Sequence, residues 1–307
     1  MGRFIRLRLF ASVPVVLGVV SITFALMYLL PGDPAATMLA RSGASSEQIA
    51  ALRAELGLDR PLYEQYFVYV GEVLRGDLGL SLASNKPVTT MLLEVLPKTL
   101  ALVFAALFIA IPVGTVMGVT AAVRKDSFVD RLLVGVAALG VSIPAFWLAL
   151  LMILLFSVTL RWLPASGQGG IEHLVLPTLV LAFGAVGTVA RTARTSMIDV
   201  LNQDYIRTAR ASGKSEREVL YKHALPNALV PVITMIGLQF GWLISGSFIV
   251  ETVFSRQGLG SMLINAILEK DLPLVQGAVL ATAILYVTLN LLVDIAYGII
   301  DPRIRYE

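Results

Sequence analysis

The sequence contains no cysteine and only two histidines, His173 and His223, which stand far apart in the chain. These absences exclude a disulfide framework and a metal site built from cysteine and histidine. Charge is scarce as well: charged residues make up 15% of the sequence, against about 25% in soluble domains. The mean hydropathy is +0.80. This composition excludes an ordinary soluble domain and predicts an integral membrane protein.

Long uncharged runs predict six membrane-spanning helices in an all-α fold, since a helix needs about 20 residues to cross the hydrocarbon core. The first run follows Arg3, Arg6 and Arg8, as in a signal peptide. It is longer than a signal core of about 7 to 15 residues, so we expect an uncleaved first span. Pro144 and Pro231 stand in the third and fifth runs and predict kinks or helix starts. The runs are residues 9–30, 100–123, 132–160, 174–190, 224–250 and 272–293.

The segment between the first two runs is too polar for lipid and predicts a small helical element outside the membrane. Ser45 with Gln48 marks a helix start, and Gly57 marks its end. Pro61 opens a second helix, which Gly76 closes. One face of this second helix is apolar, and we expect it to pack on the membrane domain rather than to contact substrate. That face comprises Tyr63, Tyr66, Phe67, Val70 and Leu74.

Lysine and arginine are distributed unevenly beside these runs, which predicts the orientation of the chain. The N-terminal residues, the segments after the second and fourth runs, and the tail together hold fifteen of them. The short loops on the other side hold three, namely Arg161, Arg256 and Lys270. The long segment after the first run is exempt, because long loops translocate largely regardless of charge. Positively charged loops stay in the cytoplasm, so we expect both termini there.

The six runs offer almost no ionisable side chain at membrane depth. Glu251 lies near the outer end of the fifth and Asp294 near the cytoplasmic end of the sixth. We expect both to cap a helix or to pair with a loop cation rather than to bind substrate. Ion-coupled transporters and intramembrane proteases need such groups at mid-membrane, so no catalytic, cofactor-binding or metal-binding residue is expected. Close helix approach is predicted at Gly184, Gly187, Gly237, Gly241 and Gly246.

Residues 204–228 form a polar segment between the fourth and fifth runs. Asp204 can cap a short helix, and Gly213 can end it in the left-handed conformation. Ser215, with Glu three residues later, predicts a capping box for a second short helix. Pro226 is expected to end that second helix.

This segment is positively charged and suits docking to another protein, although an ordinary basic loop that only orients the chain explains the charge equally well. Its Gly-Lys-Ser at 213–215 is similar to the end of a phosphate-binding loop. Thr208 stands where that loop requires glycine, and no strand pattern precedes it, so we expect no nucleotide there. The basic residues are Arg207, Arg210, Lys214, Arg217 and Lys222.

Gly213 stands ten residues before His223 and thirteen before Pro226. This spacing resembles the Glu-Ala-Ala, three residues, Gly, nine residues, Ile-x-Leu-Pro signature of permeases in binding-protein-dependent ABC importers. Leu225 and Pro226 match its ending, whereas Arg-Thr-Ala at 207–209 and His223 depart from it. YIRTARASG followed by KHALPNA resembles the dipeptide, oligopeptide and glutathione branch of the family. The similarity covers nearly the whole chain, from PGDP through ETVFSRQGLG to the closing DPRIRYE.

The resemblance implies a type I ABC importer permease fold and a non-enzymatic permease subunit of the bacterial inner membrane. It implies a second homologous permease subunit, two cytoplasmic ATPase subunits that hold ATP and Mg²⁺, and an extracytoplasmic substrate-binding protein. The substrate would be a di- or oligopeptide or a related small peptide such as glutathione. The implied ATPase-coupling residues are Arg207, Thr208, Ala209, Arg210, Ala211, Ser212, Gly213, His223, Leu225 and Pro226.

Two other functions are alternatives, although the runs offer none of the mid-membrane ion-coupling residues that the first of them needs. An ion-coupled secondary transporter moves solute without an ATPase, and a membrane recruitment protein binds a partner without moving solute. The expected organisation is a first span within 1–30, an extracytoplasmic helical element at 31–98, a five-helix core at 99–300 that includes 204–228, and a tail at 301–307.

Overall fold

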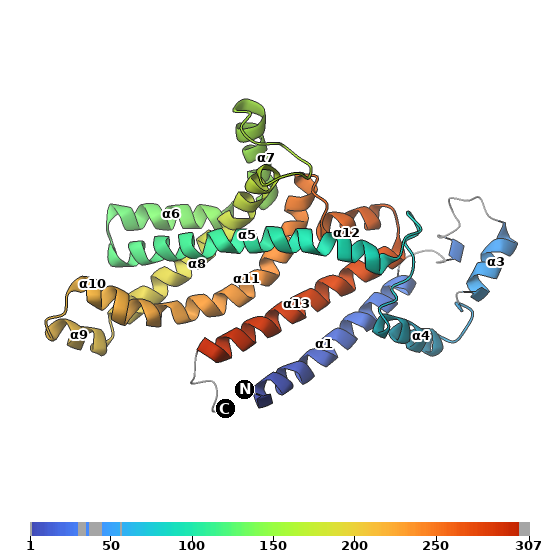
Figure 1. Ribbon diagram of the computed structural model, residues 1–307, viewed down its shortest axis with the longest axis horizontal. Helices are drawn as coiled ribbons and strands as arrows, with labels where there is room; N and C mark the ends of the chain where they lie inside the picture. The colour runs from blue at the N-terminus through green and yellow to red at the C-terminus, as the bar shows by residue number, and fades with distance from the viewer. Residues whose placement is uncertain (1, 30–34, 37–44, 56, 301–307) are drawn as a thin grey trace. The chain divides into compact units, whose positions relative to one another are not determined.

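The structure is a computed structural model of the 307-residue chain, and it describes residues 2–29, 35–36, 45–55 and 57–300. Within these ranges the chain is mainly helical, and its one β-type pairing is an isolated bridge between Leu80 and Pro87. The chain forms two compact units (Figure 1). One comprises the residues up to Lys98 together with Ser261–Leu291, and the other comprises Thr99–Gly260 together with the end of the last helix.

Four helices in the described ranges are long and apolar enough to cross a membrane. Because the structure is helical and apolar in this way, the prediction of an all-α membrane fold is confirmed. The four are α5 (Val88–Val123), α8 (Glu172–Leu201), the helix Glu216–Val253 that contains α11 (Leu225–Val253), and α13 (Leu272–Ile300).

The predicted number of six spans is not confirmed exactly. The third predicted span is a bent pair, α6 (Phe128–Ser142) followed by the helical stretch Ala145–Thr159, with an angle of 104° between them. Counted together, the pair makes a fifth candidate. The first predicted span falls in α1 (Gly2–Leu29), of which Phe10–Ala25 forms a shorter apolar helix.

Proline produces the bend after α6. Pro144 precedes α7 (Ala145–Met152), and Ile143 before it is extended, with φ −79° and ψ 122°. A residue before proline is forced out of the helical conformation by contact with the proline ring, so α6 ends there and a new helix starts. Pro231 lies inside α11 and does not mark its start.

The predicted helices after α1 are present. At the start of α3 (Ser46–Glu55), the Ser45 N–H donates to Oε1 of Gln48 at 2.9 Å, and the Gln48 N–H donates to Oγ of Ser45 at 3.3 Å. This reciprocal pair is the predicted capping box. Pro61 precedes α4 (Leu62–Leu74), and Gly76 follows that helix with a φ of +78°.

One expectation for this region is wrong in part. The apolar face of α4 packs on α1 through Tyr66, but Tyr63, Phe67 and Leu74 are 63, 69 and 82% exposed. The expected packing of the whole stripe is therefore not observed. Helix α5 begins at Val88, so the last residues of the predicted polar segment are helical.

Helices of the second unit approach closely at glycine. α8 contacts both α6 and α11, and a Cβ on Gly187 of α8 would overlap the backbone carbonyl of Ala137 in α6. A Cβ on Gly140 of α6 would lie 2.6 Å from the carbonyl oxygen of Phe183 in α8. The prediction of a close approach at Gly187 is confirmed, and any larger side chain would push these helices apart.

Glu251 caps a neighbouring helix, as expected. It is 1% exposed and accepts a hydrogen bond from the Gly260 N–H at 2.9 Å, in the first turn of α12 (Leu259–Leu268). It also accepts from the Thr99 hydroxyl at 2.6 Å, and that hydroxyl accepts from the Leu259 N–H at 2.8 Å. Its carboxylate is thus engaged within the fold. The side chain of Asp294 lies outside the described residues.

Candidate docking surface

The polar segment 204–228, hereafter the docking segment, forms two helical pieces joined by a tight turn. Shortly after α9 (Asp204–Ala211), Gly213 has a φ of +77°, the left-handed conformation that closes a helix. Ser215 caps the next piece, because its hydroxyl accepts from the Glu218 N–H at 3.3 Å. The predicted turn and second cap are therefore confirmed.

Two predictions for the docking segment are wrong. Gln203 holds the N-cap position of α9, and Asp204 is its first helical residue. Asp204 therefore acts through its charge near the helix N-terminus rather than as the cap. Pro226 does not end the second piece, because it lies inside α11 as the second residue of that helix. The chain is instead helical from Glu216 to Val253.

A π-helical piece, Val219–Ala224, joins α10 (Glu216–Glu218) to α11. In such a piece the hydrogen bonds run from residue i to residue i+5, and single turns of this kind occur inside α-helices, often at functional sites. The side-chain amide of Asn227 donates to the backbone carbonyl of His223 at 2.8 Å. Residues 216–228 of the docking segment and the fifth predicted span are consequently one continuous helix.

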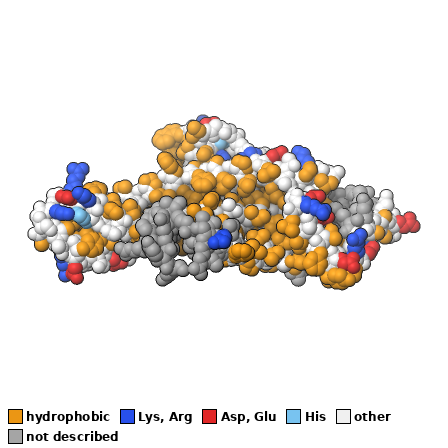
Figure 2. Space-filling model, turned by 60° about the horizontal axis from the view of Figure 1, so that its bottom comes forward, with side chains coloured by type: hydrophobic (Ala, Val, Ile, Leu, Met, Phe, Trp, Pro, Cys, Tyr) orange, Lys and Arg blue, Asp and Glu red, His pale blue; other side chains and the backbone are white. Residues whose placement is uncertain are grey.

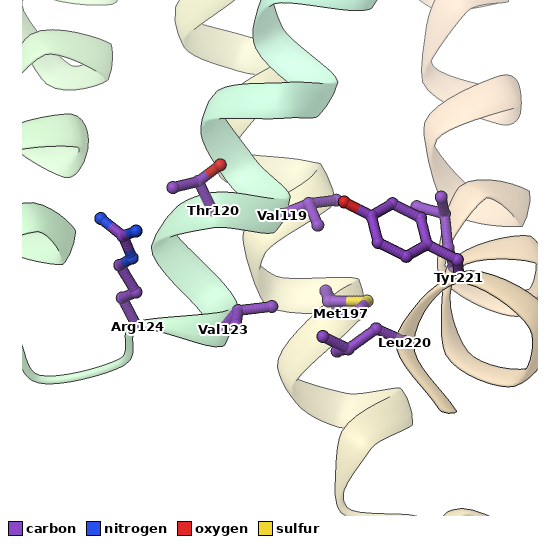
Figure 3. A pocket seen from close by; sticks show the side chains of 8 residues that line it. Val119, Thr120, Val123, Arg124, Met197, Leu220 and Tyr221 are labelled. Carbon is purple, nitrogen blue, oxygen red and sulfur yellow. The ribbon is translucent and has the colours of Figure 1, made fainter. Parts of the chain in front are cut away.

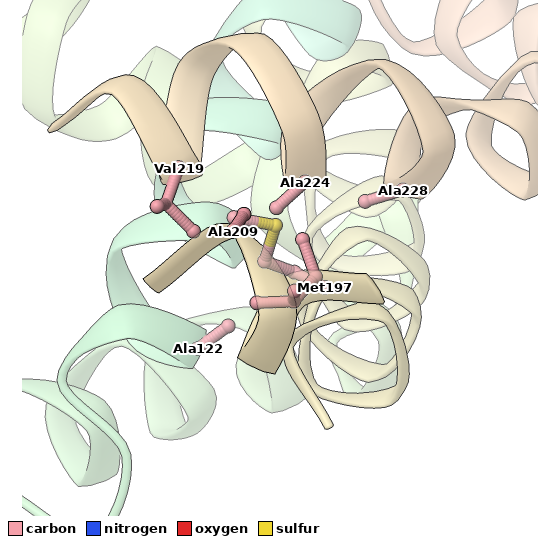
Figure 4. Packing of buried hydrophobic residues seen from close by; sticks show 7 residues of the cluster. Ala122, Met197, Ala209, Val219, Ala224 and Ala228 are labelled. Atoms are coloured by element: carbon pink, nitrogen blue, oxygen red, sulfur yellow. The ribbon is translucent and has the colours of Figure 1, made fainter. Parts of the chain in front are cut away.

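Buried side chains hold α9 against the ends of spanning helices (Figure 4). Ile206 and Ala209 of α9 are 0 and 8% exposed, and they pack in one apolar cluster with side chains from α5, α8, the π-helical piece and α11. Because packed interiors contain few voids, they transmit a displacement instead of absorbing it. A force on α9 therefore reaches the ends of α5, α8 and α11. The other members of the cluster are Ala122, Met197, Val219, Ala224 and Ala228.

The expected coupling residues divide by burial. Ala209 faces the cluster, whereas His223 and Leu225 are half-buried. The remaining residues are exposed. Arg207, Thr208, Arg210, Ala211, Ser212 and Gly213 lie on α9 and its turn, and Pro226 lies in α11.

Acidic side chains offset part of the predicted positive surface. Arg210 makes a two-point ion pair with Glu216, in which Nε donates to Oε1 at 2.7 Å and Nη2 donates to Oε2 at 3.3 Å. Exposed pairs of this kind contribute little to stability. Figure 2 shows both signs of charge around α9 and α10. The three pairs of the segment are Arg207–Asp204, Arg210–Glu216 and Lys222–Glu218.

Lys214 and His223 meet across the turn. The Lys214 ammonium lies 2.8 Å from Nε2 of His223. Because an ammonium group only donates, Nε2 is the acceptor, and the proton of the neutral ring is on Nδ1. This bond ties the Gly213 turn to the π-helical piece, so the structure brings His223 next to the turn residues with which the sequence grouped it.

A pocket of about 190 Å³ opens beside the docking segment (Figure 3). It lies between the ends of α5 and α8 and the π-helical piece, and the ring of Tyr221 points toward α5. Its wall is mostly apolar, and it shares Met197 with the buried cluster. Nowhere in the described ranges do three or more His, Cys, Asp or Glu side chains gather as metal ligands. The pocket therefore offers a mostly apolar space beside the docking segment.

Sequence reasoning missed a buried ion pair near this surface. Asp130 in the first turn of α6 accepts from Nε and Nη2 of Arg194 in α8, both at 2.7 Å. Asp130 also accepts from the Asp126 N–H at 2.9 Å, and its own N–H donates to Ser127 at 3.2 Å. The Ser127 cap is visible in the sequence, but the partner of Asp130 lies 64 residues away and follows no local pattern. The pair fastens the α5–α6 turn to α8.

Several apolar helices of spanning length, with an exposed polar segment built on their ends, define a multi-pass membrane protein. The chain belongs to the family of binding-protein-dependent transport system inner membrane components, which matches residues 110–306. The N-terminal component of the same family matches residues 1–103. The chain is therefore a transport permease component of an inner-membrane complex, and not a catalytic subunit.

Similar proteins cover the whole chain. A protein of Brucella abortus (strain 2308), provisionally named a peptide transport system permease protein, is 46% identical over 98% of both chains. The glutathione transport system permease protein GsiC of Salmonella paratyphi A is 41% identical over 100% of both. Among solved structures, inward-facing MetNI methionine ABC transporter matches with a TM-score of 0.59 and 20% identity, over 69% of this chain and 96% of that one. This last likeness shows a shared fold.

Proposed function

We propose that the chain forms part of the translocation pathway of an ATP-driven importer for di- or oligopeptides or a related small peptide such as glutathione. The ATPase activity, with its ATP and Mg²⁺, resides in partner subunits, and this chain binds no cofactor of its own. The peptide class is supported by the full-length relatives, which carry peptide and glutathione transport in their names.

The packing of α9 carries the coupling part of this proposal. Its inner side is buried in the cluster with α5, α8 and α11, while its outer side and the Gly213 turn are exposed. A partner that pushes on the exposed side moves the ends of these helices together. ATP-driven closure of two cytoplasmic ATPase subunits would thereby switch the spans between inward-facing and outward-facing states.

The proposed assembly contains this chain, a second homologous permease subunit, two ATPase subunits and an extracytoplasmic substrate-binding protein. Both termini and the docking segment lie on the cytoplasmic side, as the distribution of lysine and arginine favours. The ten expected coupling residues, Arg207 to Gly213 with His223, Leu225 and Pro226, contact or position the ATPase.

Purification in mild detergent tests the proposal. The chain is tagged at its C-terminus, co-purifying subunits are identified, and ATPase activity and uptake of a labelled dipeptide and of glutathione are measured in proteoliposomes. We expect a second permease and an ATPase to co-purify and uptake to require ATP. Arg207→Glu should release the ATPase, because Arg207 is exposed on α9.

Arg131→Glu is the matched control. It makes the same change of charge on an exposed arginine of α6, outside the docking segment, and should keep the ATPase bound. Solute movement by the chain alone, without any ATPase, would overturn the proposal in favour of a secondary transporter. Binding of a soluble partner with no uptake of any peptide would favour a recruitment protein.

A further inference from the structure

α4 lies against the C-terminal part of α1 through polar and aromatic contacts (Figure 1). The Tyr66 hydroxyl is 2.8 Å from Oγ of Ser21, and the Tyr69 hydroxyl is 3.1 Å from Oγ1 of Thr23. The ring of Phe24 lies against both tyrosines, with centroid separations of 5.4 and 5.8 Å. These contacts fix which side of α4 faces α1 and at which level along α1 it sits.

That level is inside the uncharged run of α1, not beyond its end. Thr23 stands seven residues before Leu30, where the run ends, which is about 10 Å along a helix. A second estimate of the depth of this contact comes from α13, where the Gln276 side-chain amide donates to the backbone oxygen of Thr23 at 2.8 Å. Gln276 stands four residues after Leu272, the first residue of α13, or about 6 Å. Both counts place the contact within one leaflet of a bilayer.

One side of α4, about 110° around the helix axis from the two tyrosines that contact α1, is apolar and exposed. Tyr63, Phe67 and Leu74 are 63, 69 and 82% exposed, and they fall within about 40° of one another around the helix axis. The neighbouring surface of α1 is apolar too, since Ile22, between the two contact residues Ser21 and Thr23, is 61% exposed. The exposed face of α4 therefore continues the apolar surface of α1.

Charge on α4 is confined to one edge and to the two ends. Glu64 and Glu72 lie about 80° apart on the same edge, and Arg60 and Arg75 flank the helix. Arginine at such a position keeps its guanidinium among the lipid headgroups while its stem covers apolar surface. This is the arrangement of a helix that lies in the plane of the membrane interface, where apolar faces enter to a depth of about 5–10 Å.

We propose that α4 is an interfacial helix, with Tyr63, Phe67 and Leu74 inserted among the acyl chains at the C-terminal end of α1. We assign lipid as the partner of this apolar face because the contacts with α1 place α4 at a depth that lipid occupies. A water-soluble protein partner would have to displace that lipid to reach the same face. This inference is independent of what the chain transports.

Site-directed spin labelling tests the proposal on the full-length chain. Since the sequence contains no cysteine, Phe67→Cys, Leu74→Cys and Glu72→Cys each carry one nitroxide. The labelled chains are placed in nanodiscs of phosphatidylethanolamine and phosphatidylglycerol, and collision rates with oxygen and with a water-soluble nickel chelate are compared. Oxygen concentrates in acyl chains and the chelate in water. We expect an oxygen-to-nickel ratio several times higher at 67 and 74 than at 72.

The Glu72 label is the matched control, because residue 72 is also exposed but lies on the acidic edge. A ratio at 67 and 74 as low as at 72 would mean that the face points into water, which overturns the proposal and leaves the face for a protein partner. Two labelled positions on the apolar face guard against one variant that fails to fold, and size-exclusion elution reports folding for each.

Discussion

The ion pair of Asp130 with Arg194 illustrates how much depends on single buried charges. The carboxylate is 5% exposed and the guanidinium 27%. Removing one partner of such a pair leaves the other charge uncompensated, at a cost of about 3–5 kcal/mol. We therefore expect Arg194→Met to lower the melting temperature of the purified chain clearly. The double variant Asp130→Leu/Arg194→Met should recover most of the loss, because apolar residues can replace a buried pair.

Arg207→Met is the control for this measurement. Arg207 also pairs with an aspartate, at 3.5 Å, but its side chain is 72% exposed, and exposed pairs contribute little. Equal and small effects of Arg194→Met and Arg207→Met would mean that the buried pair does not stabilise the fold.

Position 213 requires glycine because of its backbone conformation and not because of crowding by neighbouring atoms. Its φ is +77°, and an added Cβ would meet nothing within 4 Å. The left-handed conformation costs a residue with a Cβ roughly 1–2 kcal/mol, and asparagine tolerates it better than valine. We expect Gly213→Val to lower peptide uptake per ATP hydrolysed, and Gly213→Asn to lower it less. The measurement uses the reconstituted complex.

Gly135→Val provides the comparison, because Gly135 lies in α6 and an added Cβ there also meets nothing within 4 Å. It should leave uptake per ATP unchanged. Unaltered uptake in Gly213→Val would contradict the role of the turn in coupling.

Local sequence signals predicted local structure well at this scale. The pairs Ser45 with Gln48 and Ser215 with Glu218 act within one helical turn, so the hydrogen bonds that they predict depend on few other residues. Asp130 and Arg194 are brought together only by the packing of α6 on α8, so neither residue indicates the other in the sequence. The expected helix end at Pro226 was wrong, because the chain stays helical from the π-helical piece through Pro226 into α11.

At the scale of elements, the buried cluster that contains Ile206 and Ala209 connects α9 to the spanning helices, so it is required for a displacement of α9 to move them. Ile206 is fully buried there, and Ile206→Ala leaves a cavity that costs about 2–5 kcal/mol. We expect α9 to loosen locally, so amide hydrogen exchange across Asp204–Ala211 should become faster while exchange in α4 stays the same. Uptake per ATP should fall in parallel.

Tyr205→Ala, one residue away on the exposed side at 44% exposure, should leave exchange in α9 nearly unchanged. Equal exchange in the two variants would show that α9 is held by something other than the cluster.

Periodicity predicted that α4 is amphipathic but not which way its apolar face points. The sequence pattern identifies one apolar face, and in a soluble domain such a face turns inward. That face comprises Tyr63, Tyr66, Phe67, Val70 and Leu74. Next to a membrane the exposed side can be the apolar one, because lipid takes the place of a protein core. The direction became clear only from the contacts of Tyr66 and Tyr69 with α1.

At the scale of the whole molecule, the orientation of the chain follows from the position of its basic residues and is directly testable. Arg207→Cys and Trp162→Cys each give a single exposed thiol, on the docking segment and on the loop after α7. A membrane-impermeant maleimide should label residue 162 in intact spheroplasts and residue 207 only in inside-out vesicles. Labelling of residue 207 from the outside would reverse the proposed orientation.

Uncharged run length predicted the long apolar helices, whereas the break in the third run was predicted by Pro144. Runs at 100–123, 174–190, 224–250 and 272–293 each fall inside one long helix. The run at 132–160 is long enough for one span, yet it turns by 104° after Ser142. Hydropathy counts residues and does not register the backbone conformation that proline imposes on its neighbour.

Because of the π-helical piece Val219–Ala224, the number of residues between α9 and α11 determines how the docking segment is rotated around the axis of α11. Deleting Tyr221 would let this piece close as an ordinary α-helix and turn the docking segment by about 100° around the axis of α11. Such a chain should keep its helical content by circular dichroism but lose its ATPase in co-purification, whereas Tyr221→Ala, which keeps the count, should retain it. Two permeases with identical docking residues could then differ in the partner they accept through a one-residue insertion, a change that an inspection of side chains alone would overlook.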